Sequence, residues 1–176
     1  MRRGFTVAEL GVVTTLIGLL AAILFPVFAR AREHTRAVCC RAILLNIFVA
    51  LRIYATDTHG ALPPGLRGPE TLVGRNLLSD ATLRCPSAPG DLHFPAERTS
   101  QEEPSYVYIP GLKYAARHEL LVADARPRHL GNANGLFADG SICTLTPSEW
   151  LSAIPRPVAE AAGIVAPVTK PEAQGR

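Results

Sequence analysis

The chain has 176 residues, which suits one domain with an appendage, and its apolar content of 48 % excludes a chain that is disordered throughout. Eighteen basic against fifteen acidic residues leave a net charge of +3, so a chain-wide basic surface is excluded and no nucleic-acid partner is expected. The four cysteines form no C-x-x-C pair, which argues against a zinc ribbon or a thioredoxin-type redox motif.

The first predicted element is a membrane-spanning helix. From Leu10 to Ala29 there are twenty residues without a charge, and a helix of that length spans about 30 Å, the thickness of a bilayer's hydrocarbon core. No second run of this length follows, so the chain crosses a membrane at most once. The run alone fits a cleaved secretory signal, a simple anchor or a more specific segment, and Ala29-Arg30-Ala31 has the form of a signal peptidase site.

Glu9 stands at the edge of this run, between Ala8 and Leu10. A carboxylate near hydrocarbon is costly and normally has a partner. Among the lipid headgroups the same carboxylate would cost little, so the residue by itself leaves both interpretations open.

The segment Gly4-Phe5-Thr6-Val7-Ala8-Glu9-Leu10, with a short basic leader before it and the apolar run after it, resembles the prepilin N-terminus. This is the cleavage and methylation signature of type IV pilins and type II secretion pseudopilins. The resemblance implies that a prepilin peptidase cuts after Gly4, that Phe5 becomes the methylated amino terminus, and that Glu9 pairs with the amino terminus of a neighbouring subunit. Pro26 matches the proline that interrupts the family's long first helix.

The same resemblance implies a location and a set of partners. The protein would be a single-pass inner-membrane protein with a cytoplasmic N-terminus, and afterwards part of a periplasmic or cell-surface filament. Its partners would be the prepilin peptidase, other pilin or pseudopilin subunits, an inner-membrane assembly platform and membrane lipid. The charges that flank the apolar run would by themselves weakly favour export of the N-terminus, so the orientation rests on the resemblance.

The helix is expected to continue past Pro26 as an amphipathic segment over residues 30–59. One face carries apolar residues at spacings of 4, 3, 4 and 3, namely Cys40, Leu44, Ile47, Leu51 and Tyr54. Another face carries Arg30, Arg41 and Arg52, which either contact neighbouring subunits or lipid headgroups or form a solvated flank. Pro63-Pro64-Gly65 forbids continuation of the helix.

Residues 60–154 are predicted to form a loop-rich α+β domain. A short helix is expected near residues 69–76, and strands are expected over 105–110, 120–124, 135–138 and 141–145. Asp139-Gly140 between the last two strands indicates a two-residue hairpin turn in which both residues have positive φ.

The end of the chain is predicted to hold one more helix and a tail. Thr146-Pro147-Ser148-Glu149 is typical of a capping box that starts a helix, and this helix would carry Trp150, Leu151 and Ile154 inward. Residues 155–176 contain four prolines and little apolar periodicity, so they are expected to be a flexible tail.

A second resemblance covers the globular part. Its residues are Tyr54, Asp57, Gly60 and Pro63, then Cys85-Pro86, Ser105-Tyr106, and His129 followed after nine residues by Asp139-Gly140. The pattern resembles bacterial prepilin-type proteins with a His-nine-residue-Asp-Gly domain. The two resemblances imply an α+β, pilin-like fold, in which a long N-terminal helix packs its second half on a small C-terminal antiparallel sheet. The chain departs from the pattern at Cys39-Cys40, where one cysteine is usual, so no disulfide follows from the resemblance.

The cysteines would face an oxidising compartment after export, where disulfides form. Four cysteines allow three pairings, and a vicinal Cys39–Cys40 bridge would be strained. A Cys85–Cys143 bridge would tie the loop region to the hairpin. Free, buried thiols are the alternative.

No constellation of residues predicts catalysis. His129, Asp139 and Ser141 could be drawn as a hydrolase triad, but the predicted turn explains Asp139 and no Gly-x-Ser-x-Gly elbow is present. We therefore expect no catalytic residue and no enzyme activity. Some pseudopilins bind calcium in a C-terminal loop, which makes Asp124 and Asp139 weak candidates. Because oxygen ligands are sparse there, no metal and no cofactor are expected, and His129 is expected to bond to Asp124 or to the hairpin backbone.

These interpretations favour a structural subunit, pilin or pseudopilin, of a type IV pilus-like or type II secretion filament. The alternative is an exported or membrane-anchored surface binding protein, or a minor pilin for DNA uptake, that keeps the prepilin-type signal. The near-neutral mature charge weakens the DNA-uptake hypothesis, because phosphate binding needs a basic patch. The expected parts are a leader (1–4), a transmembrane assembly helix (5–29), the amphipathic helix (30–59), the globular domain (60–154) and the tail (155–176).

Overall fold

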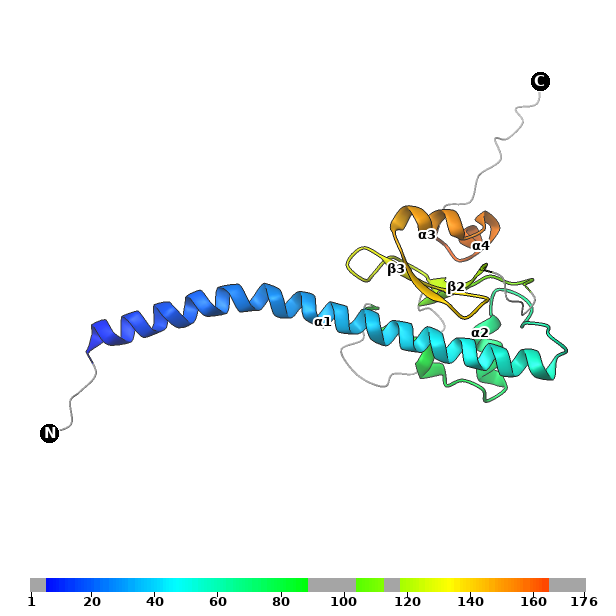
Figure 1. Cartoon of the computed structure of the whole chain (residues 1–176), viewed down its shortest axis with the longest axis horizontal. Coiled ribbons are helices and arrows are strands. Elements are labelled where there is room, and N and C mark those ends of the chain that lie inside the picture. Colours follow the sequence, from blue (N-terminus) through cyan, green and yellow to red (C-terminus); the bar gives the residue numbers. More distant parts are fainter. Residues whose placement is uncertain (1–5, 89–103, 113–117, 165–176) are drawn as a thin grey trace, which may run out of the picture.

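The computed structural model describes residues 6–88, 104–112 and 118–164. A long N-terminal helix packs on a four-stranded antiparallel sheet, so the α+β, pilin-like arrangement expected from the sequence is confirmed. In chain order the elements are α1 (Val7–Asp57), α2 (Gly68–Gly74), the 3-10 helix η1 (Asp80–Leu83), β1 (Tyr106–Tyr108), β2 (Leu120–Asp124), β3 (Ala133–Phe137), β4 (Ile142–Leu145), α3 (Pro147–Ala153) and α4 (Arg156–Ala161). The first half of α1 projects from the globular part as a bowed rod, and the second half lies along the sheet (Figure 1).

Helix α1 begins and ends where other groups satisfy its free backbone atoms. At its start Thr6 Oγ1 accepts the backbone N–H of Glu9 at 3.3 Å, and Glu9 Oε2 accepts the backbone N–H of Thr6 at 2.8 Å, which is a capping box. At its end Gly60 has a φ of +86° and donates its N–H to the carbonyl of Ala55 at 2.7 Å. Between these ends the helix runs for 51 residues and continues through Pro26.

The first half of α1 has no cover from the rest of the described chain. Every described residue up to Arg32 is exposed, and Phe25 and Val7 are exposed to 81 % and 88 %. Among the described residues, α1 is long and apolar enough to cross a membrane. Exposed apolar side chains on all sides of a helix are unfavourable in water, so this half needs lipid or other helices around it.

The second half of α1 supplies one side of the main core. All five residues of the predicted apolar face are buried, namely Cys40, Leu44, Ile47, Leu51 and Tyr54. They pack with buried residues of the sheet such as Tyr108 and Leu136. The arginine face is not simply solvated, because Arg41 Nε donates to Asn134 Oδ1 at 3.2 Å and its guanidinium also donates to Thr144 Oγ1. Arg41 therefore fastens α1 to β3 and β4.

The sheet is a meander with strand order β1-β2-β3-β4. The β3–β4 register pairs Leu136 with Ile142, and Phe137 donates its N–H to the Ser141 carbonyl at 2.9 Å. The expected positive φ at both turn residues is wrong for Asp139, since of these two residues Gly140 has the left-handed backbone, with φ +87°. The turn is a three-residue loop ended by a left-handed glycine, which is a common hairpin form.

Helices α3 and α4 cover the face of the sheet opposite α1 (Figure 1). The predicted capping box at α3 is confirmed, with Thr146 and Glu149 bonding reciprocally. Trp150 and Ile154 are buried as expected, and Trp150 Nε1 donates to the Asp124 carbonyl at 2.8 Å, whereas Leu151 is exposed.

Helix α4 corrects the expectation of a flexible tail from residue 155. Its first turn holds a proline, which suits a helix start, and Val158 and Ala159 are buried in the second core. The proline content that indicated a tail therefore marks the beginning of a short helix instead. Residues 165–176 of the predicted tail lie outside the described residues.

Candidate functional site

Two parts of the molecule carry candidate functional residues, and the first is the start of α1. Glu9 caps Thr6 with bonds to both its backbone and its hydroxyl, each at 2.8 Å, and lies on the exposed part of the helix. Pro26 lies in the same exposed part and is accommodated without a break in the helix. Gly4 and Phe5, the expected cleavage and methylation residues, lie outside the described residues.

The second part is a buried cluster that four separate segments build. Its members are Cys40 of α1, Cys85 just after η1, Asp124 at the end of β2, and His129 in the β2–β3 connection. One ligand-type atom from each lies within 4.8 Å of the others, and all four residues are buried. We call these four residues the buried cluster.

The polar atoms of the buried cluster lie 2.9–3.6 Å from their neighbours in the cluster. The Cys40 thiol donates to Asp124 Oδ1 at 2.9 Å, and Cys85 Sγ lies 3.5 Å from His129 Nε2. His129 Nε2 lies 3.6 Å from Asp124 Oδ2. Four side chains that could each bind a cation or a proton therefore point at one centre.

A second layer of side chains holds the buried cluster in place. His129 Nδ1–H donates to Glu33 Oε1 at 3.2 Å, and Glu33 accepts from Ser87 Oγ at 2.6 Å. Asn134 donates its backbone N–H and its side-chain amide to Asp124 Oδ2, at 2.6 and 3.2 Å. These bonds fix the orientation of the histidine ring and of the carboxylate.

Burial and the neighbouring groups change the proton affinities in the buried cluster. Burial raises the pKa of Asp124 to about 6, although hydrogen bonds from Cys40 and Asn134 oppose this. The contact between the two thiols lowers the pKa of Cys85 and, together with burial, raises the pKa of Cys40. Burial disfavours charged His129, but the bond to Cys85 and the nearby carboxylates outweigh it, so the pKa of His129 is raised.

The structure separates two pairs of residues that the sequence analysis had linked. The Cys85–Cys143 bridge is wrong for this structure, because Cys143 is exposed on β4 and Cys85 is buried beside Cys40, and both are free. Asp139 does not share a site with Asp124. The expected approach of His129 to Asp124 is present.

Asp139 belongs to a small exposed network at the hairpin. His118 Nδ1 lies 3.0 Å from Asp139 Oδ2, and Ser141 donates to Asp139 Oδ1 from its hydroxyl at 2.6 Å and from its backbone at 2.9 Å. His118 also stacks on Phe137, with ring centroids 3.9 Å apart. The Ser141 hydroxyl donates a hydrogen bond to the Asp139 carboxylate, so the network stabilises the turn. The triad drawn from His129, Asp139 and Ser141 does not assemble, because His129 lies in the buried cluster.

Sequence reasoning missed the part that Cys40 plays. Its place on the apolar helical face predicted burial, and burial is what the structure shows. The second resemblance includes one cysteine at Cys39-Cys40, together with Cys85 and His129, and this set could have indicated the cluster. No local spacing joins these residues, however, because they lie far apart in the sequence.

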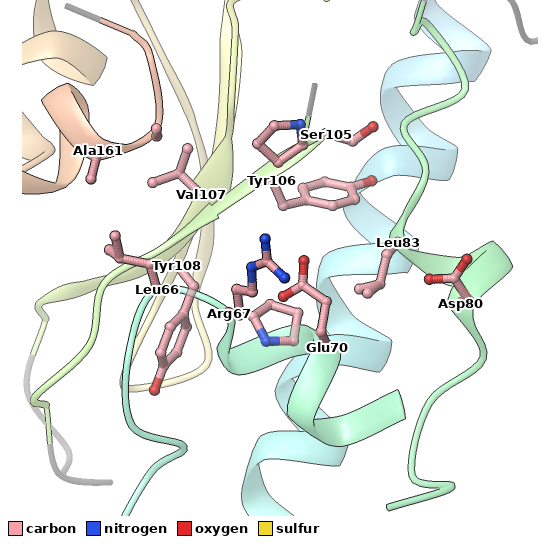
Figure 2. Close-up of a pocket in the computed structure, with 13 residues that line it drawn as sticks. Leu66, Arg67, Glu70, Asp80, Leu83, Ser105, Tyr106, Val107, Tyr108 and Ala161 are labelled. Carbon is pink, nitrogen blue, oxygen red and sulfur yellow. The ribbon is translucent and has the colours of Figure 1, made fainter. Parts of the chain in front are cut away.

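A cavity of about 520 Å³ lies beside β1, and none of the four residues of the buried cluster lines it. Figure 2 shows Arg67 and Glu70 near its middle, with Tyr106 and Tyr108 of β1 along one wall and Asp80 at the far side. The lining mixes charged and apolar groups and indicates no particular class of ligand.

Comparison of the chain with models of protein families, with curated proteins and with solved structures found no match. The described residues show a pilin-like α+β arrangement, in which an N-terminal helix that is long and apolar enough to span a membrane packs on a small antiparallel sheet.

Proposed function

We propose that the protein is a structural subunit, pilin or pseudopilin, of a type IV pilus-like or type II secretion filament. The observation that carries this proposal is the form of α1. One continuous helix has an apolar half without protein cover and a second half built into the core of the globular domain. Such a helix can stand in a bilayer as a monomer and pack with like helices in a filament without refolding of the domain.

The N-terminal residues supply the processing and assembly steps of this proposal. A prepilin peptidase at the cytoplasmic face of the inner membrane cuts the peptide bond after Gly4 and methylates the new amino terminus at Phe5. Glu9, next to that terminus, then pairs with the charged amino group of a neighbouring subunit. A carboxylate inside a bundle of apolar helices needs such a counter-charge.

The helix also explains how a subunit leaves the bilayer. On assembly, the apolar side chains of α1 exchange contacts with lipid for contacts with other apolar helices, so the buried apolar area changes little. Helix packing and the Glu9 pair then determine how neighbouring helices are aligned. Pro26 lacks one backbone donor, which loosens the hydrogen bonding of α1 within the apolar half. The globular domain is then carried on the outside of the filament, in the periplasm or at the cell surface.

The experiment that tests this proposal identifies the mature N-terminus. The full chain is expressed together with a prepilin peptidase, and the purified protein is analysed by intact-mass and N-terminal peptide mass spectrometry. We expect a chain that starts at methylated Phe5, and we expect Gly4→Ala to block this processing. Gly11→Ala is the matched control, because no atom lies within 4 Å of a Cβ at that position, and it should be processed normally.

Two outcomes would contradict the proposal. A chain that starts just after Ala29-Arg30-Ala31 would indicate an ordinary secretory signal. A chain that keeps Met1 in the presence of an active peptidase would indicate a simple anchor. Either result would favour an exported or membrane-anchored surface binding protein.

A further inference from the structure

We propose that the buried cluster of Cys40, Cys85, Asp124 and His129 binds one zinc ion, which ties α1 to the sheet. This inference is independent of the filament proposal, because it concerns the interior of the globular domain. Nothing in the local sequence spacing indicates it, since the four residues come from four segments of the fold.

The distances between the ligand atoms suit a tetrahedral metal. Zinc bonds of about 2.0–2.3 Å in a tetrahedron place neighbouring ligand atoms about 3.3–3.8 Å apart. The Cys85 Sγ to His129 Nε2 distance is 3.5 Å, and the His129 Nε2 to Asp124 Oδ2 distance is 3.6 Å. The 2.9 Å contact from Cys40 Sγ to Asp124 Oδ1 would lengthen slightly when the thiol proton leaves.

The chemistry of the ligand atoms selects the ion. Two sulfurs, one imidazole nitrogen and one carboxylate oxygen form a mixed set that zinc accepts in this geometry. Calcium and magnesium prefer oxygen ligands alone, so the two cysteines argue against them. All four ligand residues are buried, which suits a closed structural site and leaves no open position for a substrate.

The second layer has the form that zinc ligands need. His129 Nδ1–H donates its hydrogen bond to Glu33 Oε1, which leaves the Nε2 lone pair directed into the cluster. Asn134 donates twice to Asp124 Oδ2, which fixes the carboxylate with Oδ1 next to Cys40 and with Oδ2 3.6 Å from His129 Nε2. A histidine held by a carboxylate is the usual support of a zinc-bound imidazole.

A cation at the centre would offset most of the negative charge of the ligand atoms. Zinc binding releases the thiol protons of Cys40 and Cys85 to solvent, and two thiolates, one carboxylate and the neutral imidazole around Zn²⁺ then carry a total charge of −1. The Tyr106 hydroxyl, 3.4 Å from Cys40 Sγ, can donate to that thiolate. Without a cation, the buried carboxylate of Asp124 depends on hydrogen bonds from Cys40 and Asn134 and on the nearby His129 for its stabilisation.

A disulfide between Cys40 and Cys85 is the competing use of the same two sulfur atoms. It would form by loss of two protons and two electrons to an oxidant of the exported compartment. A disulfide would not explain why Asp124 and His129 also converge on the two sulfur atoms. We therefore propose zinc, and the disulfide is one outcome of the test.

The test measures metal and thiols on the same protein. The full chain is purified in detergent without chelator, and its zinc content is measured by plasma mass spectrometry. We expect one zinc ion per chain, fast reaction of the exposed Cys39 and Cys143 with a thiol reagent, and reaction of the other two cysteines only after a chelator is added. Replacement by Co²⁺ should give the intense absorption of cobalt–thiolate bonds.

A matched pair of variants locates the site. Cys40→Ser should lower the zinc content at least about tenfold, whereas Cys39→Ser, the exposed neighbour, should leave it unchanged. The cobalt spectrum is recorded on the unmodified chain. The proposal can therefore be tested even if a variant fails to fold. Absence of zinc together with a mass lower by about 2 Da would show the disulfide and overturn the proposal. Zinc retained in both Cys40→Ser and Cys85→Ser would overturn it as well.

Discussion

Glu33 and His129 are joined across the fold, with Glu33 Oε1 3.2 Å from His129 Nδ1. Glu33 lies on α1 directly after the exposed apolar half, and His129 lies in the connection between β2 and β3. The contact therefore fixes the globular domain relative to the helix at the place where the helix leaves it. In the proposed filament this rigidity would matter, because the helix would set the position of the domain on the filament surface.

The first prediction concerns this contact. Glu33→Ala should lower the free energy of unfolding by about 1–2 kcal/mol, because it removes hydrogen bonds to a buried imidazole and to Ser87. The measurement is chemical denaturation of the full chain in detergent. Glu160→Ala is the control, since its bond to Arg156 is exposed and such pairs contribute less. An equal decrease in the free energy of unfolding in the two variants would contradict a stabilising role for the contact between Glu33 and His129.

The second prediction uses the close approach of Gly140 to Phe48. A Cβ at residue 140 would lie 2.8 Å from two ring carbons of Phe48 on α1, and the φ of Gly140 is +87°. Gly140→Ala should therefore destabilise the protein by about 2–3 kcal/mol, from backbone strain and overpacking together. Thermal and chemical unfolding would measure it.

Gly131→Ala is the matched control for that prediction. Gly131 has a φ of +85°, but a methyl group added there would meet no atom within 4 Å, so this change tests backbone strain alone, at about 1 kcal/mol. The difference between the two variants should largely disappear when Phe48 is also changed to alanine. A difference that persists in the double variants would mean that the Phe48 contact is not its cause.

The third prediction concerns the apolar face of α1 within the core. Leu44 is completely buried and Leu45 is half exposed, although they are adjacent on the helix. Leu44→Ala should cost about 2–4 kcal/mol of stability, whereas Leu45→Ala should cost much less, because only the first leaves a cavity. Denaturation of the full chain in detergent compares them, and similar losses would show that the core does not use this face.

The apolar face shows which features a sequence pattern can predict. The spacing of Cys40, Leu44 and Ile47 follows the helical repeat, so the periodicity alone identified the residues that pack on the sheet. Strands β2 and β4 and the capping box of α3 also carry local signals, and they lie where those signals placed them.

The buried cluster shows what such patterns leave out. Cys40 and Asp124 are 84 residues apart, and only the folded sheet brings them to 2.9 Å. The Cys85–Cys143 pairing failed because β4 presents Cys143 to solvent, and strand alternation was not sufficient to determine which face that would be. Helix α4 was missed because prolines at a helix start resemble prolines of a loop.

The fourth prediction is a pH dependence at the hairpin. Hydrogen bonds from Ser141, and then from His118, lower the pKa of Asp139 to about 2 from an ordinary value of 3.8. Because the pKa falls on folding, the stabilising effect of this carboxylate is present above pH 3.8 and is lost as the pH falls through about 2. NMR titration of the Asp139 carboxyl carbon would measure it directly.

Ser141→Ala separates the serine from the other causes of that shift. It removes the hydroxyl bond to Asp139 and should move the pKa of Asp139 upward, towards its ordinary value. Ser152→Ala, on α3, is the control and should leave the titration unchanged, since its hydroxyl donates to the Glu149 carbonyl. An unchanged pKa in Ser141→Ala would assign the shift to His118 or to the turn backbone.

The fifth prediction separates the two roles of Glu9. As the capping residue it accepts hydrogen bonds from Thr6, and as an assembly residue it would pair its charge with a neighbouring amino terminus. Glu9→Gln keeps a side chain that suits a capping box but removes the charge. We therefore expect normal processing to a chain that starts at Phe5, and a loss of filament incorporation of about tenfold or more, as for a lost charge-assisted bond of roughly 1.5–3 kcal/mol.

The measurement compares the amount of subunit in sheared filaments with the amount left in the membrane fraction. Thr15→Ser, in the same exposed half of α1, keeps a hydroxyl that can donate to the Gly11 carbonyl and serves as the control. Incorporation of Glu9→Gln at the level of this control would show that the charge is not used in assembly. Processing at Phe5 is measured separately. That result would therefore contradict only the proposed pairing of Glu9 with a neighbouring amino terminus, and not the proposed cleavage after Gly4.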